Sequence, residues 1–174
     1  DGEGVLRAVV RLIIASGQRM AGSVSGGCLE ADLVMRGFFR TERAPVVVRY
    51  DVRSDDDLRE GFGLGCDGAV EVLLERGAVD PAEDDTFGAL DRVLRHERPA
   101  VLASTFRADD PATPFGTRVI VDPVVGLSAS ATEDHDPRVG AFANTACAER
   151  KTFVADLGDR HVLFEHVAPP PHLF

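Results

Sequence analysis

Two short glycine-rich segments each carry a cysteine, and their residue types are the ones in this chain best suited to chemistry. The first, GSVSGGCLE, runs from Gly22 to Glu30 and places Cys28 directly after two glycines. The second, GFGLGCDG, runs from Gly61 to Gly68 and has four glycines in eight residues around Cys66. An apolar pattern of helical spacing follows the first cysteine. Cys28 is therefore expected in the first turn of a helix, where unpaired backbone N–H groups stabilise a thiolate.

The same N–H groups could bind a phosphate or another oxyanion, since Gly26 and Gly27 have no Cβ to block the approach. The glycines around Cys66 let backbone N–H groups turn toward one point, as in anion-binding nests. The structural alternative is that the cysteines are small buried apolar residues and the glycines serve turns, which is the commoner use of both residue types. Spacing alone leaves the two interpretations open. Cys147, among alanines, is expected in the core.

Other motifs of catalytic or metal-binding type are absent from the sequence. Neither glycine segment matches the dinucleotide-binding GxGxxG or the phosphate-binding GxxxxGK[ST] pattern. GSVSG differs from the GxSxG of serine hydrolases because its central residue is Val24. The three cysteines form no CxxC pair and the five histidines show no ligand spacing. We therefore expect no nucleotide site, hydrolase triad or structural zinc site in this chain.

The elements around the two segments follow from periodicity and turn residues. Apolar runs at Val5–Ala15 and Arg19–Val24 flank SGQ and predict a β-hairpin. A helix is predicted from Cys28 to near Arg43, with apolar residues at helical spacing: Leu29, Leu33, Val34 and Phe38. PVVVRYDV and AVEVLLE predict one strand on each side of the second glycine segment.

The remainder of the chain mixes helices and strands without strict alternation. Helices are predicted for residues 79–98 and 136–150, and strands for AVLASTF, TRVIVDP, KTFVADL and HVLFEHVAP. This pattern predicts an α/β fold of the mixed α+β kind, a layered domain with a mixed β-sheet and flanking helices. We assign residues 1–168 to this domain, and 169–174 to a proline-rich linker.

Composition limits the class of protein and of partner. A formal net charge of −10 argues against nucleic acid as a partner, because binding to phosphates requires a basic surface. No apolar run reaches the roughly 20 residues of a membrane span. The N-terminus lacks the features of a secretory signal, and three widely spaced cysteines indicate free thiols. A cytoplasmic location is the expectation.

At the two glycine–cysteine segments the sequence resembles the xanthine dehydrogenase accessory factor family, usually called XdhC/CoxI. The matching strings are GSVSGGCLEADLV, VVVRYDV, GLGCDGAVEVLLE and the terminal HVAPPPHLF, so that the resemblance covers most of the chain. Bacterial proteins of this family bind molybdenum cofactor, whose molybdopterin carries a phosphate, protect it during sulfuration and help insert it into xanthine dehydrogenase-type enzymes. The resemblance implies a cofactor chaperone rather than an enzyme, with no catalytic residue.

The resemblance also implies which residues hold the cofactor. They are Ser23, Ser25, Gly26, Gly27, Cys28 and Glu30 in the first segment, and Gly63, Gly65, Cys66 and Gly68 in the second. Cys28 and Cys66 would be soft ligands or neighbours of molybdenum. Glu30 could accept hydrogen bonds from the amino edge of the pterin or could favour the helix N-terminus through its charge, and both roles stay open.

The implied partners are a molybdenum hydroxylase of the xanthine dehydrogenase or CO dehydrogenase type and a cysteine desulfurase or sulfurtransferase, with a homodimer as one option. Members of the family often continue into a Rossmann-type domain, so a longer protein could also bind NAD(P). This chain differs from the family at Asp67, where glycine is usual, and between Val10 and Arg11, where the family carries a serine- and proline-rich loop. Two alternatives remain: an oxidoreductase-like enzyme with a redox cysteine whose NAD(P)-binding domain is absent here, and a cofactor-free protein interaction module.

Overall fold

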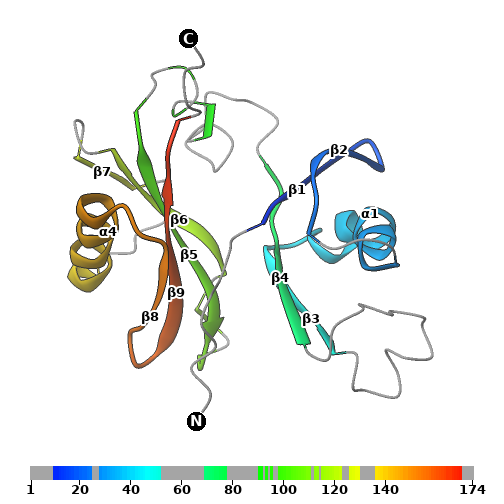
Figure 1. Ribbon diagram of the computed structural model, residues 1–174. Coiled ribbons are helices and arrows are strands. Elements are labelled where there is room, and N and C mark those ends of the chain that lie inside the picture. The colour runs from blue at the N-terminus through cyan, green and yellow to red at the C-terminus, as the bar shows by residue number, and fades with distance from the viewer. Residues whose placement is uncertain are drawn as a thin grey trace. The chain divides into compact units, whose positions relative to one another are not determined.

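Figure 1 shows the chain as a computed structural model that divides into two compact units, Asp1–Arg76 and Gly77–Phe174. The structure describes residues 10–24, 28–51, 69–77, 90–91, 93, 95, 98–110, 112–113, 115–122, 126–129 and 136–169. Each unit is described by itself below. The assignment of residues 1–168 to one domain and 169–174 to a linker stays a prediction.

The first element described in the first unit is the predicted hairpin. Strands β1 (Leu12–Ala15) and β2 (Gln18–Gly22) pair in antiparallel fashion, with Ala15 opposite Gln18. The two residues of the turn, Ser16 and Gly17, both have positive φ, at 52° and 70°. Two such residues make the tight turn whose twist suits a two-residue hairpin.

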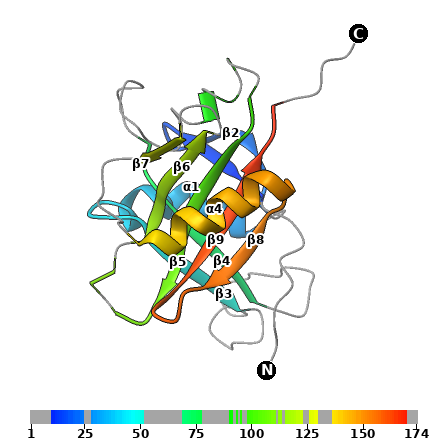
Figure 2. The ribbon, with the colours of Figure 1, turned by 90° about the vertical axis from the view of Figure 1, so that its left-hand side faces the viewer.

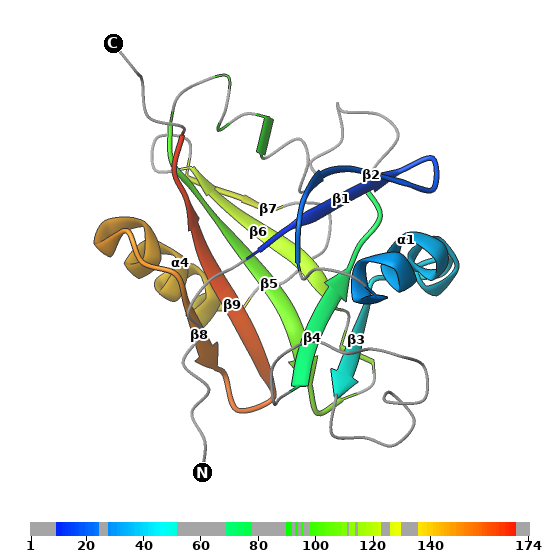
Figure 3. The same cartoon turned by 45° about the vertical axis from the view of Figure 1, so that its right-hand side comes forward.

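Helix α1 (Cys28–Arg40) follows, with strands β3 (Val46–Asp51) and β4 (Ala69–Leu74), which pair in antiparallel fashion (Figure 3). The core of this unit is formed by three buried side chains, Leu29, Leu33 and Tyr50, and by apolar residues packed against them. Burial of this shared cluster positions α1 within the unit, because removal of apolar surface from water is the dominant favourable contribution to packing.

The prediction for α1 is correct in its start and differs from the structure at Phe38 and at the end of the helix. Leu29 and Leu33 are buried as expected, but Phe38 is 68% exposed. An α-helix advances about 100° per residue, so a residue nine positions beyond Leu29 lies on the opposite side of the helix. The helix also ends at Arg40 rather than near Arg43.

Among its described residues, the second unit contains a five-stranded sheet, and helix α4 (Pro137–Glu149) covers one face of it. The strands lie in the order β7-β6-β5-β9-β8, and α4 crosses the sheet in Figure 2. The strand bounds are β5 Ala100–Ala108, β6 Gly116–Asp122, β7 Gly126–Ala129, β8 Phe153–Asp156 and β9 Arg160–Val167. All but β7 were expected.

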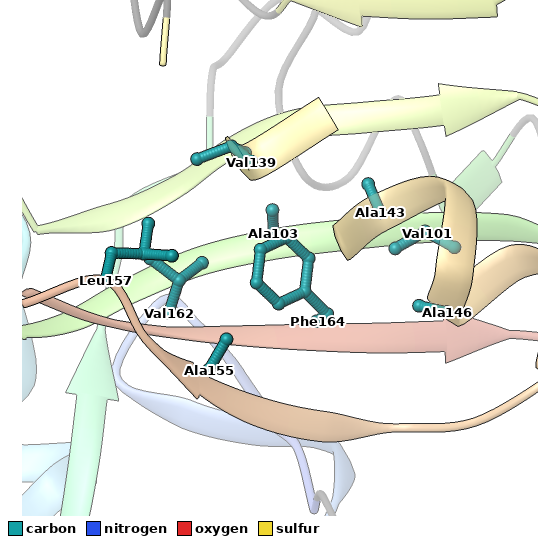
Figure 4. Close-up of a cluster of buried hydrophobic side chains, with 9 residues drawn as sticks. All are labelled: Val101, Ala103, Val139, Ala143, Ala146, Ala155, Leu157, Val162 and Phe164. Atoms are coloured by element: carbon teal, nitrogen blue, oxygen red, sulfur yellow. The ribbon is translucent and has the colours of Figure 1, made fainter. Parts of the chain in front are cut away.

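The larger of the two buried clusters described in the second unit lies between α4 and the sheet (Figure 4). Val139, Ala143 and Ala146 of the helix meet a fully buried Phe164 on β9. The rings of Phe153 and Phe164 lie 5.5 Å apart between centroids. Small residues on the helix allow it to approach the sheet closely, and the aromatic rings fill the remaining space.

The local sequence explains where α4 begins and ends. Asp136 is the N-cap and accepts a hydrogen bond from the Arg138 backbone N–H, and Pro137 occupies the first helical position. Arg150 ends the helix in a left-handed conformation with φ 54°.

The mixed α/β fold class is confirmed, and the pairing of strands adds detail to it. A sheet of mixed direction was expected, but every strand pairing among the described residues is antiparallel. Three of the pairings in the second unit, β5 with β6, β6 with β7 and β8 with β9, join consecutive strands, whose direct return connections produce antiparallel ladders. None of the helices described has the length and apolar character that crossing a membrane requires.

Candidate functional site

The first glycine segment connects the end of β2 to the first turn of α1. Gly22 ends the strand with φ +77°, a conformation that side chains with a Cβ rarely adopt. A Cβ at this position would lie 2.0 Å from the carbonyl oxygen of Arg11, so the two backbones approach as closely as glycine alone permits. Gly22 thus sets the direction in which the chain leaves the hairpin toward Ser23.

Glu30, in the first turn of α1, holds the residues that follow β2. Its Oε1 accepts hydrogen bonds from the Ser23 hydroxyl at 2.5 Å and from the Val24 backbone N–H at 3.1 Å. Its Oε2 lies 3.6 Å from Nη1 of Arg19 on β2. We call these four residues, Arg19, Ser23, Val24 and Glu30, the Glu30 clasp. It ties the start of the first glycine segment to a largely buried carboxylate in the first turn of α1.

The clasp bears on the two roles that the sequence left open for Glu30. A carboxylate in the first turn of a helix interacts favourably with the helix dipole. Its oxygens already accept from Ser23 and Val24 and face the Arg19 guanidinium, so a donor on a ligand would compete with these groups. The contacts therefore support a positioning role for Glu30, in which it shapes the segment that precedes Cys28.

A buried polar cluster fixes α1 against β3. Asp32, 7% exposed, accepts hydrogen bonds on Oδ2 from the Tyr50 hydroxyl and from Arg40 Nη1, both at 2.6 Å. Arg36 Nε lies 3.2 Å from its other oxygen. Burial, and then the hydrogen bond to Asp32, raise the pKa of Tyr50 to about 12. A buried carboxylate is stable only when paired in this way, so the cluster holds the helix in one position.

The structure brings together two of the predicted site residues. Ser23 and Glu30 are hydrogen-bonded, and Cys28 is the first residue of α1, as the sequence predicted. The other predicted positions lie outside the described residues: Ser25, Gly26, Gly27, Gly63, Gly65, Cys66, Asp67 and Gly68. The third cysteine, Cys147, is half-buried against the core of the second unit, as expected.

In the part of the chain that the structure describes, no three His, Cys, Asp or Glu side chains are grouped so that they could hold a metal ion. Neither the Cys28 side chain nor Cys66 belongs to that part. The role of these two cysteines as neighbours of molybdenum therefore stays a prediction.

Two residues of this site were not singled out from the sequence. Arg19 lies in a strand seven residues before the segment's double glycine, and only the hairpin brings it to Glu30. Gly22 was treated as part of a motif, but its function is conformational. A glycine at the end of a predicted strand was the available signal, since such a position often marks a close backbone approach.

Comparison with known proteins relates part of the chain to a xanthine dehydrogenase protein. Over 77 residues, 44% of this chain, the sequence is 34% identical to a protein of Bacillus subtilis (strain 168) that is named as the probable A subunit of xanthine dehydrogenase. The matched stretch spans 23% of that protein's length. No family profile matches the chain.

Proposed function

We propose that this chain binds molybdenum cofactor and assists its sulfuration and its insertion into a molybdenum hydroxylase of the xanthine dehydrogenase type. The observation that carries the proposal is the similarity to a protein named as part of a probable xanthine dehydrogenase. The geometry at the start of α1 adds support, because Cys28 opens a helix whose first turn carries Glu30, which binds Ser23 and Val24.

The start of α1 suits a phosphorylated pterin. The first backbone N–H groups of a helix have no partner within the helix and bind anions. A bare carboxylate beside them would repel an anion, but that of Glu30 is offset by the Arg19 guanidinium at 3.6 Å and by two hydrogen-bond donors. The residues that would hold the phosphate are those from Ser25 to Cys28.

The thiols would provide the second part of the site. When bound, the cofactor supplies a molybdenum centre with sulfur ligands, for which thiolate is a chemically compatible neighbour. Cys28 at the helix start and Cys66 in the second glycine segment would hold and protect this centre. The proposed partners are the hydroxylase that receives the cofactor and a cysteine desulfurase or sulfurtransferase that supplies sulfur.

Cysteine variants test the proposal directly. Cys28→Ala and Cys66→Ala, purified from a host with intact cofactor synthesis, are expected to lose most of the molybdenum and pterin that the wild-type protein carries. The measurement is metal analysis by mass spectrometry together with fluorescence of the released, oxidised pterin. The matched control is Cys147→Ala, which is expected to leave the cofactor content unchanged because Cys147 packs, half-buried, against the core of the second unit.

Two results would contradict the proposal. Unchanged molybdenum and pterin in both Cys28→Ala and Cys66→Ala would remove these thiols from the site. Absence of pterin from the wild-type protein, also after incubation with free molybdenum cofactor, would favour the interaction module instead.

A further inference from the structure

Helix α1 exposes a second apolar face in addition to the face that packs in the core. Met35, Phe38 and Phe39 are 72%, 68% and 74% exposed, while Leu29 and Leu33 on the other side of the helix are buried. Half of the six exposed large hydrophobic side chains in the described part of the chain belong to this helix. We call Met35, Phe38 and Phe39 the outer face of α1. In Figure 3, α1 lies beside β3 in the first unit.

The spacing of these residues makes them one surface. Positions three and four apart are neighbours on a helix, so Phe38 and Phe39 both adjoin Met35. The two phenyl rings lie 6.0 Å apart in an edge-on arrangement. A helix that is apolar on both sides is normally covered on both sides, and clustered rather than scattered exposed apolar residues mark interaction sites.

Arg76, which follows β4, holds a positive charge against this face. Its guanidinium carbon lies 4.0 Å from the centre of the Phe38 ring. Its Nη2 donates to the Phe38 carbonyl at 2.5 Å, and its Nε donates to the Thr41 hydroxyl at 3.2 Å. These bonds cap the end of α1 and fix the ring and the cation together. Ordering both groups in advance lowers the entropy that a partner's binding would cost.

One positive charge at the outer face has no acidic partner among the described residues. Arg36 and Arg40 both pair with Asp32, whereas Arg76 contacts the Phe38 ring, the Phe38 carbonyl and the Thr41 hydroxyl. Distant charges are screened within about 8 Å at physiological salt, so a partner at this face meets the charge of Arg76 more than the net charge of −10 of the whole chain. Two copies that met through this face would bring like charges together. The local charge instead favours an acidic partner.

We propose that the outer face of α1, together with Arg76, is a docking site for an acidic amphipathic helix of another protein. The apolar side of that helix would cover Met35, Phe38 and Phe39, and its carboxylates would pair with Arg76. Aromatic, methionine and arginine side chains are the residue types enriched at the centres of protein interfaces. The proposal goes beyond the cofactor-binding role and does not depend on it.

Binding of designed peptides tests the proposal. The probes are two fluorescein-labelled helical peptides with the same leucine face, one with a glutamate-rich and one with a lysine-rich polar face, measured by fluorescence anisotropy. The acidic peptide is expected to bind the wild-type protein more tightly than the basic peptide does. Its affinity is expected to fall as the salt concentration rises. We expect each of two variants, Phe39→Ser and Arg76→Gln, to weaken binding of the acidic peptide about tenfold or more, as loss of an interface hot spot does.

The control and the contrary outcomes are specific to this surface. Met20→Ser changes a side chain of similar exposure, 64%, on β2 and is expected to leave binding unchanged. The proposal is overturned if both peptides bind the wild-type protein with equal affinity. It is also overturned if the acidic peptide binds Phe39→Ser as tightly as the wild-type protein. The proposal is also overturned if analytical ultracentrifugation shows a concentration-dependent dimer that the Phe39→Ser substitution dissociates, because a second copy of the chain would then occupy this face. Thermal unfolding verifies that each variant is folded.

Discussion

At the scale of single residues, one carboxylate organises the candidate site. Glu30 accepts from Ser23 and from the Val24 backbone and faces Arg19, so the start of the first glycine segment is fastened to the first turn of α1. These donors come from β2 and from the residues after it, while the acceptor belongs to α1. The site therefore depends on a contact between two elements, and loss of a single side chain should loosen the whole segment.

Replacing Glu30 tests this organisation. Glu30→Ala removes the acceptor, leaves the Val24 N–H without its partner and is expected to lower the free energy of unfolding by about 1–2 kcal/mol. The amide of Val24 should exchange with solvent faster, as measured by NMR. Glu30→Gln keeps an acceptor oxygen and should preserve most of the protection while losing the ion pair with Arg19. Unchanged exchange at Val24 in Glu30→Ala would contradict a positioning role.

At the scale of elements, the β1–β2 hairpin determines how the chain enters α1. Two glycines of this hairpin have positive φ but face different surroundings. Gly17 lies in the turn, where an added Cβ meets nothing within 4 Å, whereas at Gly22 it would meet the Arg11 carbonyl oxygen at 2.0 Å. Both positions carry a conformational penalty for other residues, but only Gly22 adds a steric one.

These two glycines form a matched pair of variants. Gly17→Ala is expected to cost about 1 kcal/mol of unfolding free energy, from backbone conformation alone. Gly22→Ala should cost at least about 2 kcal/mol and shift the NMR signals of Ser23 and Val24, because the strand ends must separate. Denaturant titration gives the free energies. A Gly22→Ala variant no less stable than Gly17→Ala would exclude the close approach.

At the scale of the whole molecule, each of the two compact units contains an ionic network, and the two networks respond to opposite extremes of pH. In the first unit, burial and then the hydrogen bond to Asp32 raise the pKa of Tyr50 from 10.0 to about 12. In the second, hydrogen bonds from the Arg138 side chain lower the pKa of Asp136 from 3.8 to about 2. Asp136 also approaches Arg160 at 3.3 Å, which ties the start of α4 to β9.

The signs of the two shifts give a prediction for each unit. Tyr50 binds its proton more tightly in the folded state, so its contribution to stability is complete below pH 10 and is lost as the pH rises toward about 12. Asp136 is more acidic when folded, so its contribution is complete above pH 3.8 and is lost as the pH falls toward about 2. Alkali should therefore weaken the first unit and acid the second.

Two readouts separate these effects. The chain has one tyrosine and no tryptophan, so absorbance near 295 nm reports ionisation of Tyr50 alone. Its midpoint is expected near 12 in the folded protein and near 10 in denaturant. Asp136→Asn keeps a capping oxygen and should make the stability of the second unit less dependent on acid pH, as measured by amide exchange in α4. Asp159→Asn, at an exposed site, should leave that dependence unchanged. A folded-state midpoint near 10 would show that the Tyr50–Asp32 contact does not persist.

The sequence by itself determined most of the elements, because local rules govern them. The turn at Ser16 and Gly17, the start of α1 at Cys28 and the Pro137 start of α4 depend on backbone preferences and capping, which near neighbours in the chain decide. The mixed α/β fold class follows from the same patterns. The glycines and Cys28 were enough to locate the candidate site in the sequence, but not to describe which of its residues contact one another.

Tertiary structure alone decided which residues meet. Arg19 reaches Glu30 only after the hairpin folds, and Arg76 reaches Phe38 only after β4 pairs with β3. Phe38 illustrates the reason: its spacing placed it on an apolar helix, but which side of the helix is covered depends on partners that are distant in the sequence. Periodicity shows that a surface is apolar, while the fold decides whether that surface becomes core or remains available to a partner.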